Sequence, residues 1–168
     1  GPALQAQFDG IHNLAIAAND DIYLADPWNS RVRKIDSRTG RVTTVAGNGQ
    51  KGVPADGAEA VKSPLVDPRA VAVSADGTIY ILERSGHALR AVDARGRIRT
   101  LVGTGQKGAT GDGGDALKAT LNGPKHLCLD REGDVIIADA ENHLVRKYLS
   151  REGKIVRVAG NGQKVTAG

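Results

Sequence analysis

The hexapeptide AGNGQK occupies residues 46–51 and returns unchanged at residues 159–164, and a near copy, VGTGQK, occupies residues 102–107. Three sets of residues share one spacing, of 56 or 57 positions: Gly47, Gly103 and Gly160; Asp26, Glu83 and Asp139; and Phe8, Leu65 and Leu121. A spacing that recurs in three independent markers indicates a tandem repeat, and the length of 168 residues accommodates three units.

Each unit contains four short apolar runs rich in β-branched residues and leucine, bounded by Gly, Asp, Asn or Ser, which is typical of strands. In the first unit these runs are residues 14–16, 22–25, 31–35 and 41–47, and the other two units repeat them. The second run of each unit is apolar throughout, which predicts a strand covered on both faces.

The segments between the runs have the composition of tight turns. Gly77 and Gly133 stand where a hairpin between the first and second strands needs a positive φ. Between the second and third strands, Asn29, Gly86 and Asn142 are the residues that best tolerate a left-handed conformation, so we expect it there. Four antiparallel strands per unit, repeated in tandem, predict an all-β chain of β-propeller blades.

Residues 68–96, PRAVAVSADGTIYILERSGHALRAVDARG, and their counterparts at 10–36 and 123–148 resemble the NHL repeat. The connecting segment 103–124, GTGQKGATGDGGDALKATLNGP, resembles the long linker of bacterial NHL arrays. The resemblance covers nearly the whole chain. The middle unit departs from it, with Glu83 in place of the usual aspartate and the pair Gly86-His87 in place of Asn-His. We expect one domain, 1–168, of three blades at about 8–64, 65–120 and 121–168, with residues 1–7 a linker remnant.

The resemblance implies a fold rather than a reaction, because NHL propellers serve as protein-binding platforms, RNA-binding domains, sensor ectodomains and, in a few relatives, metal-assisted lyases. Such arrays are often exported or displayed at the cell surface. This sequence shows no signal-peptide pattern and no run long enough for a membrane span, and it leaves the compartment open. The absence of methionine indicates a processed chain, a natural fragment, or a piece cut or designed from a longer array.

The glycine phrase is interpreted as a turn rather than a nucleotide site. Residues 47–52 and 103–108 match the pattern G-x-G-x-x-G, but the third copy has Val165 in place of the last glycine. A dinucleotide site also needs a following helix and a βαβ unit, and these units contain four strands instead. We therefore expect no cofactor, and we interpret the phrase as the exit turn of each blade.

A recurring acid precedes the second hairpin of each unit, and a recurring arginine follows it by seven residues. The three pairs are Asp26 with Arg33, Glu83 with Arg90, and Asp139 with Arg146. Repetition in every blade favours a turn cap and a structural bridge over catalysis, since a reaction usually needs one asymmetric site. We assign no catalytic residue and expect a protein that is not an enzyme.

No metal site is predicted. The acidic segments 111–115 and 55–57 lack the dense oxygen ligands of a calcium loop, so we expect flexible linkers. The four histidines include no close pair with zinc-ligand spacing, although converging loops could still unite them. Cys128 takes the position of Ala15 and Ala72 in the other units, which predicts a buried and unreactive thiol.

His12, Arg69 and Lys125 share one repeat position, immediately before the first strand of each unit. The first strand of a propeller blade lines the central channel, so these residues are expected to form a basic ring at one mouth. With a net charge of +4, such a ring suits an anion or a phosphate backbone. A solvated rim explains the same residues, and stacking aromatics are scarce, so we do not expect a nucleic acid as the partner.

Propellers close with roughly four to eight blades, so three blades form an open arc with two uncovered apolar flanks. The sequence favours a half-propeller that forms a six-bladed homodimer and acts as a scaffold or binding platform, for a protein or an anionic ligand and without a membrane. Two alternatives stay open: RNA or anion binding through the basic ring, and a metal-assisted lyase or lactonase.

Overall fold

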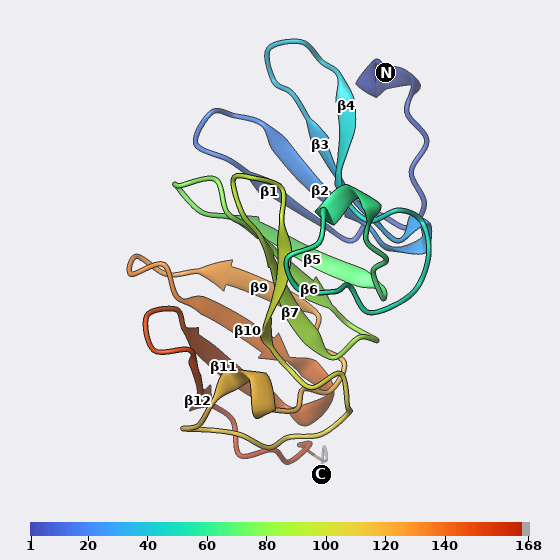
Figure 1. Ribbon diagram of the computed structural model, residues 1–168. Coiled ribbons are helices and arrows are strands. Elements are labelled where there is room, and N and C mark those ends of the chain that lie inside the picture. Colours follow the sequence, from blue (N-terminus) through green and yellow to red (C-terminus); the bar gives the residue numbers. More distant parts are fainter. Residues whose placement is uncertain (166–168) are drawn as a thin grey trace.

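The structure, a computed structural model, describes residues 1–165 and contains three four-stranded antiparallel sheets that follow one another as a fan of blades (Figure 1). Within each sheet the strands lie in sequence order. Blade 1 consists of β1 (Asn13–Ile16), β2 (Ile22–Asp26), β3 (Arg31–Ile35) and β4 (Val42–Ala46). Blade 2 consists of β5 (Pro68–Val73), β6 (Ile79–Glu83), β7 (Ala88–Val92) and β8 (Ile98–Val102). Blade 3 consists of β9 (His126–Leu129), β10 (Val135–Asp139), β11 (Leu144–Leu149) and β12 (Lys154–Ala159).

Five short 3₁₀ helices complete the elements within residues 1–165: η1 (Ala3–Gln5), η2 (Pro27–Asn29), η3 (Ala60–Lys62), η4 (Ala116–Lys118) and η5 (Ala140–Asn142). The predicted all-β architecture of three four-stranded blades is confirmed. Strand β5 contacts both β1 and β9, so the first strands of the three blades lie next to one another along the inner edge of the fan.

The glycine phrase is the turn that leaves each blade. Gly47, Gly103 and Gly160 follow the fourth strands with φ of 90°, 102° and 90°. A Cβ on Gly103 would lie 2.4 Å from the carbonyl oxygen of His87, and the other two glycines approach Ser30 and His143 in the same way. Both the positive φ and this close backbone approach require glycine.

The left-handed residue of the second hairpin lies one position later than the sequence indicated. Ser30, His87 and His143 have φ of 48°, 49° and 55°, whereas Gly86 is not among the positive-φ residues. The expectation for Asn29, Gly86 and Asn142 was therefore wrong. In blades 1 and 3 the preceding residues form a 3₁₀ turn, and the left-handed residue ends it.

The linkers are held against the blades, contrary to the expectation of flexible segments. The linker 47–64 is hydrogen-bonded to blade 2, where the backbone N–H of Gly57 donates to the carbonyl of Ile98. The linker 103–120 is hydrogen-bonded to blade 3 in the same way, where the backbone N–H of Gly113 donates to the carbonyl of Ile155. Each linker thus runs along the fourth strand of the following blade. Residues 1–7 lie on blade 1 in the same manner, with Ala3 donating to the carbonyl of Gly40.

Acidic side chains anchor these linkers. Asp56 accepts the backbone N–H of Thr100 at 2.7 Å, and Asp112, its counterpart in the next linker, accepts from Nε of Arg146 at 2.9 Å. Asp115 accepts from the backbone N–H of Leu117 and so caps η4. Asp56 and Asp112 therefore dock the linkers on the blades.

The core lies between blades rather than within one sheet. The residues that pack between blades 1 and 2 include Val32, Ala46, Val71, Ile79, Ile81, Val92 and Ile98. Those between blades 2 and 3 include Leu82, Leu89, Leu101, Val135, Ile137, Tyr148 and Ile155. We call the face of a blade on the side of the preceding blade its leading flank, and the opposite face its trailing flank.

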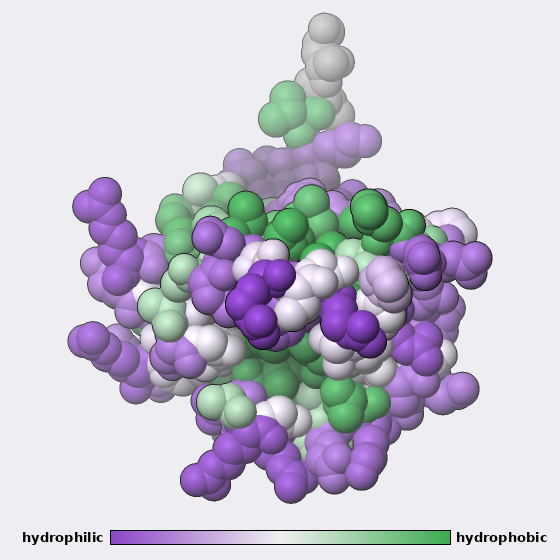
Figure 2. Space-filling view, turned by 90° about the horizontal axis from the view of Figure 1, so that it is seen from above, coloured by the Kyte–Doolittle hydropathy of each residue, from purple (hydrophilic) through white to green (hydrophobic). Residues whose placement is uncertain are grey.

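The leading flank of blade 1 and the trailing flank of blade 3 have no neighbouring blade within residues 1–165. Figure 2 looks onto blade 1 from this open side, and hydrophobic side chains gather there among the hydrophilic ones. Leu14 and Ile16 are exposed on blade 1, and Val158 is exposed on blade 3. Cys128 is exposed on β9, which corrects the expectation of a buried thiol: no following blade covers its position.

Candidate functional site

Side chains from all three blades meet around one cavity of about 280 Å³ at the inner edge of the fan. His12, Arg69 and Lys125, which the repeat pattern placed at one channel mouth, all line it. Arg84, which follows β6, and His126, the first residue of β9, line it as well. The structure thus unites the three sequence candidates and adds two more basic or titratable residues.

The two added residues escaped the sequence pattern because they do not recur. The counterparts of Arg84 are Pro27 and Ala140, and those of His126 are Asn13 and Ala70. A comparison of repeats detects residues that every blade shares, whereas a binding site gains its specificity from residues that one blade alone carries.

His12 and Arg69 are in direct contact, with Nη1 of the guanidinium against Nε2 of the imidazole. Because arginine only donates, a hydrogen bond between the two groups requires Nε2 of His12 to accept. Burial and the charge of Arg69 lower the pKa of His12, although Asp67 acts in the opposite direction. Nε of Arg69 is buried without a hydrogen-bond partner among the described residues, and the nearest carboxylate oxygen, on Asp67, lies 3.7 Å away.

Two carboxylates partly balance the cations. Arg84 lies between them, 4.0 Å from Asp67 and 3.9 Å from Glu141. Lys125 approaches Glu141 at 2.9 Å, and this contact lowers the pKa of the Glu141 carboxyl. Three permanent cations thus face two carboxylates, and protonation of His12 would add further positive charge.

The recurring acids belong to the frame of each blade. Asp26, Glu83 and Asp139 accept backbone N–H groups from Asp9, Val66 and Asn122 at 2.7 to 2.8 Å, which fastens the entry to each blade. Their arginine partners lie at 3.6 Å in Arg33–Asp26, 2.8 Å in Arg90–Glu83 and 3.4 Å in Arg146–Asp139. All three acids are buried, and none of them lines the cavity.

Two larger hollows lie near the basic cavity, and Ser85 lines both of them. One, of about 540 Å³, shares Arg84 with the basic cavity and extends between blades 2 and 3 past His87 and Lys107. The other, of about 580 Å³, lies between blades 1 and 2 and is lined by Lys51 and by the exposed indole ring of Trp28. The basic cavity therefore adjoins the hollow beside His87 and Lys107 through Arg84.

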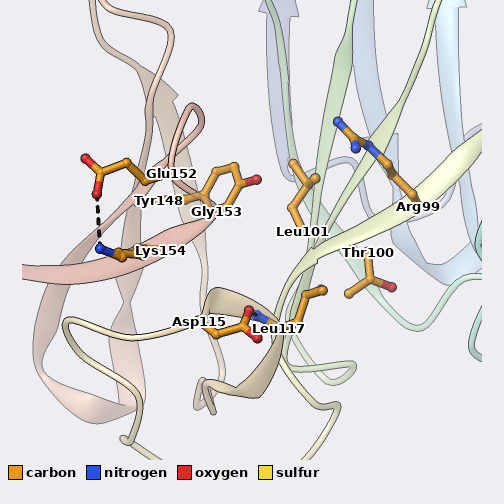
Figure 3. A pocket seen from close by; sticks show the side chains of 9 residues that line it. All are labelled: Arg99, Thr100, Leu101, Asp115, Leu117, Tyr148, Glu152, Gly153 and Lys154. Carbon is orange, nitrogen blue, oxygen red and sulfur yellow. Dashed lines mark hydrogen bonds and ion pairs between the residues drawn. The ribbon is translucent and has the colours of Figure 1, made fainter.

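A different cavity, of about 370 Å³, opens at the outer rim between β8 and blade 3 (Figure 3). Leu101 and Tyr148 form apolar parts of its lining, while Glu152 and Lys154 form an ion pair at 3.4 Å on the blade 3 side. Arg99 lies across the gap on blade 2. The charged groups that line this outer cavity do not converge on one point, so we regard the cavity as a gap at the seam between blades 2 and 3.

No group of three or more His, Cys, Asp or Glu side chains within residues 1–165 has the arrangement to hold a metal ion. Within the same residues, no helix combines the length and apolarity needed to cross a membrane.

Comparison with known proteins agrees with the repeat pattern. Residues 34–110 match the teneurin NHL domain, and residues 121–148 match the NHL repeat. The chain is 31% identical over 139 residues to Protein SUPPRESSOR OF QUENCHING 1, chloroplastic, of Arabidopsis thaliana, covering 75% of this chain and 12% of that protein. It is 32% identical over 96 residues to Teneurin-3 of Mus musculus, covering 50% of this chain and 4% of that protein. It therefore spans a small part of these relatives.

Among solved structures, a Bacteroides thetaiotaomicron protein of unknown function matches with a TM-score of 0.69 at 18% identity, over 91% of this chain and 36% of that one. A gluconolactonase of Xanthomonas campestris matches with a TM-score of 0.65 at 17% identity, over 91% of this chain and 48% of that one. At these identities the likeness shows the fold alone.

Proposed function

Because this chain belongs to the NHL-repeat family of β-propellers, we propose that it is half of a ring: two copies join into a six-bladed propeller that acts as a non-enzymatic binding platform. The observation that carries the proposal is the pair of open flanks. Leu14 on the leading flank of blade 1 is 60% exposed, whereas its counterpart Val71 in blade 2 is 2% exposed. Val158 on the trailing flank of blade 3 is 55% exposed, whereas its counterpart Leu101 is 6% exposed.

The two open flanks are complementary because they repeat the two sides of the seams inside the chain. The side chains Val71, Ile79 and Val92 pack against blade 1, and their counterparts on the open leading flank are Leu14, Ile22 and Ile35. Ala15, Tyr23 and Val32 form the other side of that seam, and their counterparts on the open trailing flank are Cys128, Ile136 and Val145. Blade 3 of one copy is thus suited to pack on blade 1 of another.

Burial supplies the driving force. A large aliphatic side chain gains about 1.5–3 kcal/mol when it is removed from water, and each ring closure covers several of them. The two-copy ring contains this seam twice, related by a two-fold axis along the channel.

The test compares two substitutions of leucine by aspartate. Leu14→Asp places a charge in the proposed seam, whereas Leu117→Asp places one on η4, at a position exposed in the second linker as its counterpart Val61 is in the first. We expect the unmodified chain and Leu117→Asp to have twice the 17.5 kDa chain mass by light scattering, and Leu14→Asp to have the single mass. An unchanged mass for a folded Leu14→Asp variant would refute this seam.

We propose binding rather than catalysis because the buried acids are engaged in the hydrogen bonds and ion pairs that frame the blades, and the cavity is lined by basic groups. The gluconolactonase likeness makes a metal-assisted hydrolase the competing function. Elemental analysis of the purified chain separates the two. Calcium or zinc at one equivalent per chain, together with lactone hydrolysis lost on chelation, would overturn the platform.

A further inference from the structure

We propose that the cavity lined by His12, Arg69, Arg84, Lys125 and His126 binds the phosphate group of a small phosphorylated molecule, and that its affinity for a dianion increases as the pH falls from 7.5 to 6. The inference rests on the proposed binding role of this surface but not on ring closure, because one chain supplies all five side chains.

The donors fit a phosphate dianion. Two guanidinium groups, on Arg69 and Arg84, offer forked donors that match phosphate oxygens, and Lys125 adds a point charge. Nε of Arg69 is a buried donor without a hydrogen-bond partner among the described residues. Buried donors usually have a hydrogen-bond acceptor. An anion in the cavity would provide an acceptor for this N–H after a small movement of the Arg69 side chain.

The size of the cavity favours a small ligand over a nucleic acid. A volume of about 280 Å³ accommodates a phosphate and a few further heavy atoms. Its lining contains no Phe, Tyr or Trp on which a base could stack, and single-stranded nucleic acids are usually held by such stacking. The neighbouring hollow beside His87 and Lys107 leaves room for the remainder of a phosphorylated molecule.

His12 supplies the pH dependence. His12 faces Arg69 and Asp67 from blade 2, Arg84 beyond β6, and His126 from blade 3. Burial and the charge of Arg69 lower the pKa of His12, whereas Asp67 raises it. A bound dianion would offset the cations and favour the protonated ring, and by linkage protonation would favour the anion.

Isothermal titration calorimetry with inorganic phosphate and with sulfate tests the site. Sulfate remains a dianion between pH 6 and 7.5, so a change in its affinity reports the protein rather than the ligand. We expect Arg69→Gln and Arg84→Gln each to weaken phosphate binding by roughly tenfold or more. Arg157→Gln, which removes the same charge from an exposed position on β12, should leave the affinity within about twofold. Sulfate should bind more tightly at pH 6 than at pH 7.5, and His12→Gln should reduce this difference.

Several results would overturn the site: no heat with either anion at millimolar concentration, equal weakening by Arg157→Gln, or tight binding of single-stranded RNA that all three arginine variants weaken alike. Measuring the mass of the same samples separates this proposal from ring closure. A monomer that binds phosphate would leave the site standing, and a dimer that does not would refute the site alone.

Discussion

At the scale of single residues, blade 2 differs from its neighbours in the side chain that fills the space beside the recurring acid. In blades 1 and 3 an asparagine side chain bonds to the recurring aspartate, with Asn29 3.0 Å from Asp26 and Asn142 2.7 Å from Asp139. In blade 2 the longer Glu83 fills that space. A Cβ on Gly86 would lie 2.7 Å from Oε2 of Glu83, so the glutamate and the glycine are matched.

This matching predicts strong coupling between the two positions. Gly86→Asn alone should destabilise the chain by about 1–3 kcal/mol through overpacking, and Glu83→Asp alone should also destabilise it because the carboxylate withdraws from Arg90. The double variant restores the Asp–Asn pair of the other blades and should be more stable than the two single effects predict. Urea unfolding measures all four proteins, and simple additivity would contradict the explanation.

The sequence predicted part of this residue-scale picture. The acid and arginine positions follow from the repeat, and the structure places them in ion pairs. The compensation at Gly86 was not predicted, because a glycine in a turn suggests backbone freedom, whereas here it provides space for a side chain. Likewise, Arg84 and His126 join the basic cavity through the three-dimensional fan, which the repeat pattern does not describe.

At the scale of elements, the exit turn and the linker join consecutive blades. The backbone N–H of Gly103 donates to the carbonyl of Ala116 in η4, so the turn and its linker fold onto each other. The sequence predicted the turn from its glycines. It did not reveal that Asp56 and Asp112 would hold the linkers, since their partners lie 44 and 34 residues away.

Two glycine substitutions distinguish the cost of a positive φ from the cost of placing a Cβ against a neighbouring backbone segment. Gly77 and Gly103 both have positive φ, but only at Gly103 would an added Cβ meet backbone atoms within 4 Å, whereas the space beside Gly77 is open. We expect Gly77→Ala to cost about 1–2 kcal/mol and Gly103→Ala to cost clearly more, because the turn must also move away from His87. Thermal unfolding of both variants provides the comparison. Equal losses would show that the close approach is not needed for stability.

At the scale of the whole molecule, the chain is an arc whose ends resemble the two sides of its own seams. The sequence predicted the arc from the number of repeats. It also predicted a buried Cys128, by analogy with Ala72, and the thiol is exposed because blade 3 has no following blade within residues 1–165. The error is informative, because the analogy holds in a closed ring.

Cys128 is therefore a reporter for ring closure. In the two-copy ring the thiol lies on the flank that blade 1 of the other copy covers, so a thiol reagent should react slowly at high protein concentration. Dilution below the dissociation constant, or Leu14→Asp, should accelerate the reaction. Equal rates in the unmodified chain and in Leu14→Asp would mean that this flank is open in both.

The measurement that tests the central claim most directly is the absolute mass of the unmodified chain, by light scattering behind a sizing column over a range of concentrations. The six-bladed ring predicts twice 17.5 kDa, maintained on dilution until the seams dissociate. A mass of 17.5 kDa at every concentration would contradict it and show that three blades remain an open arc in solution.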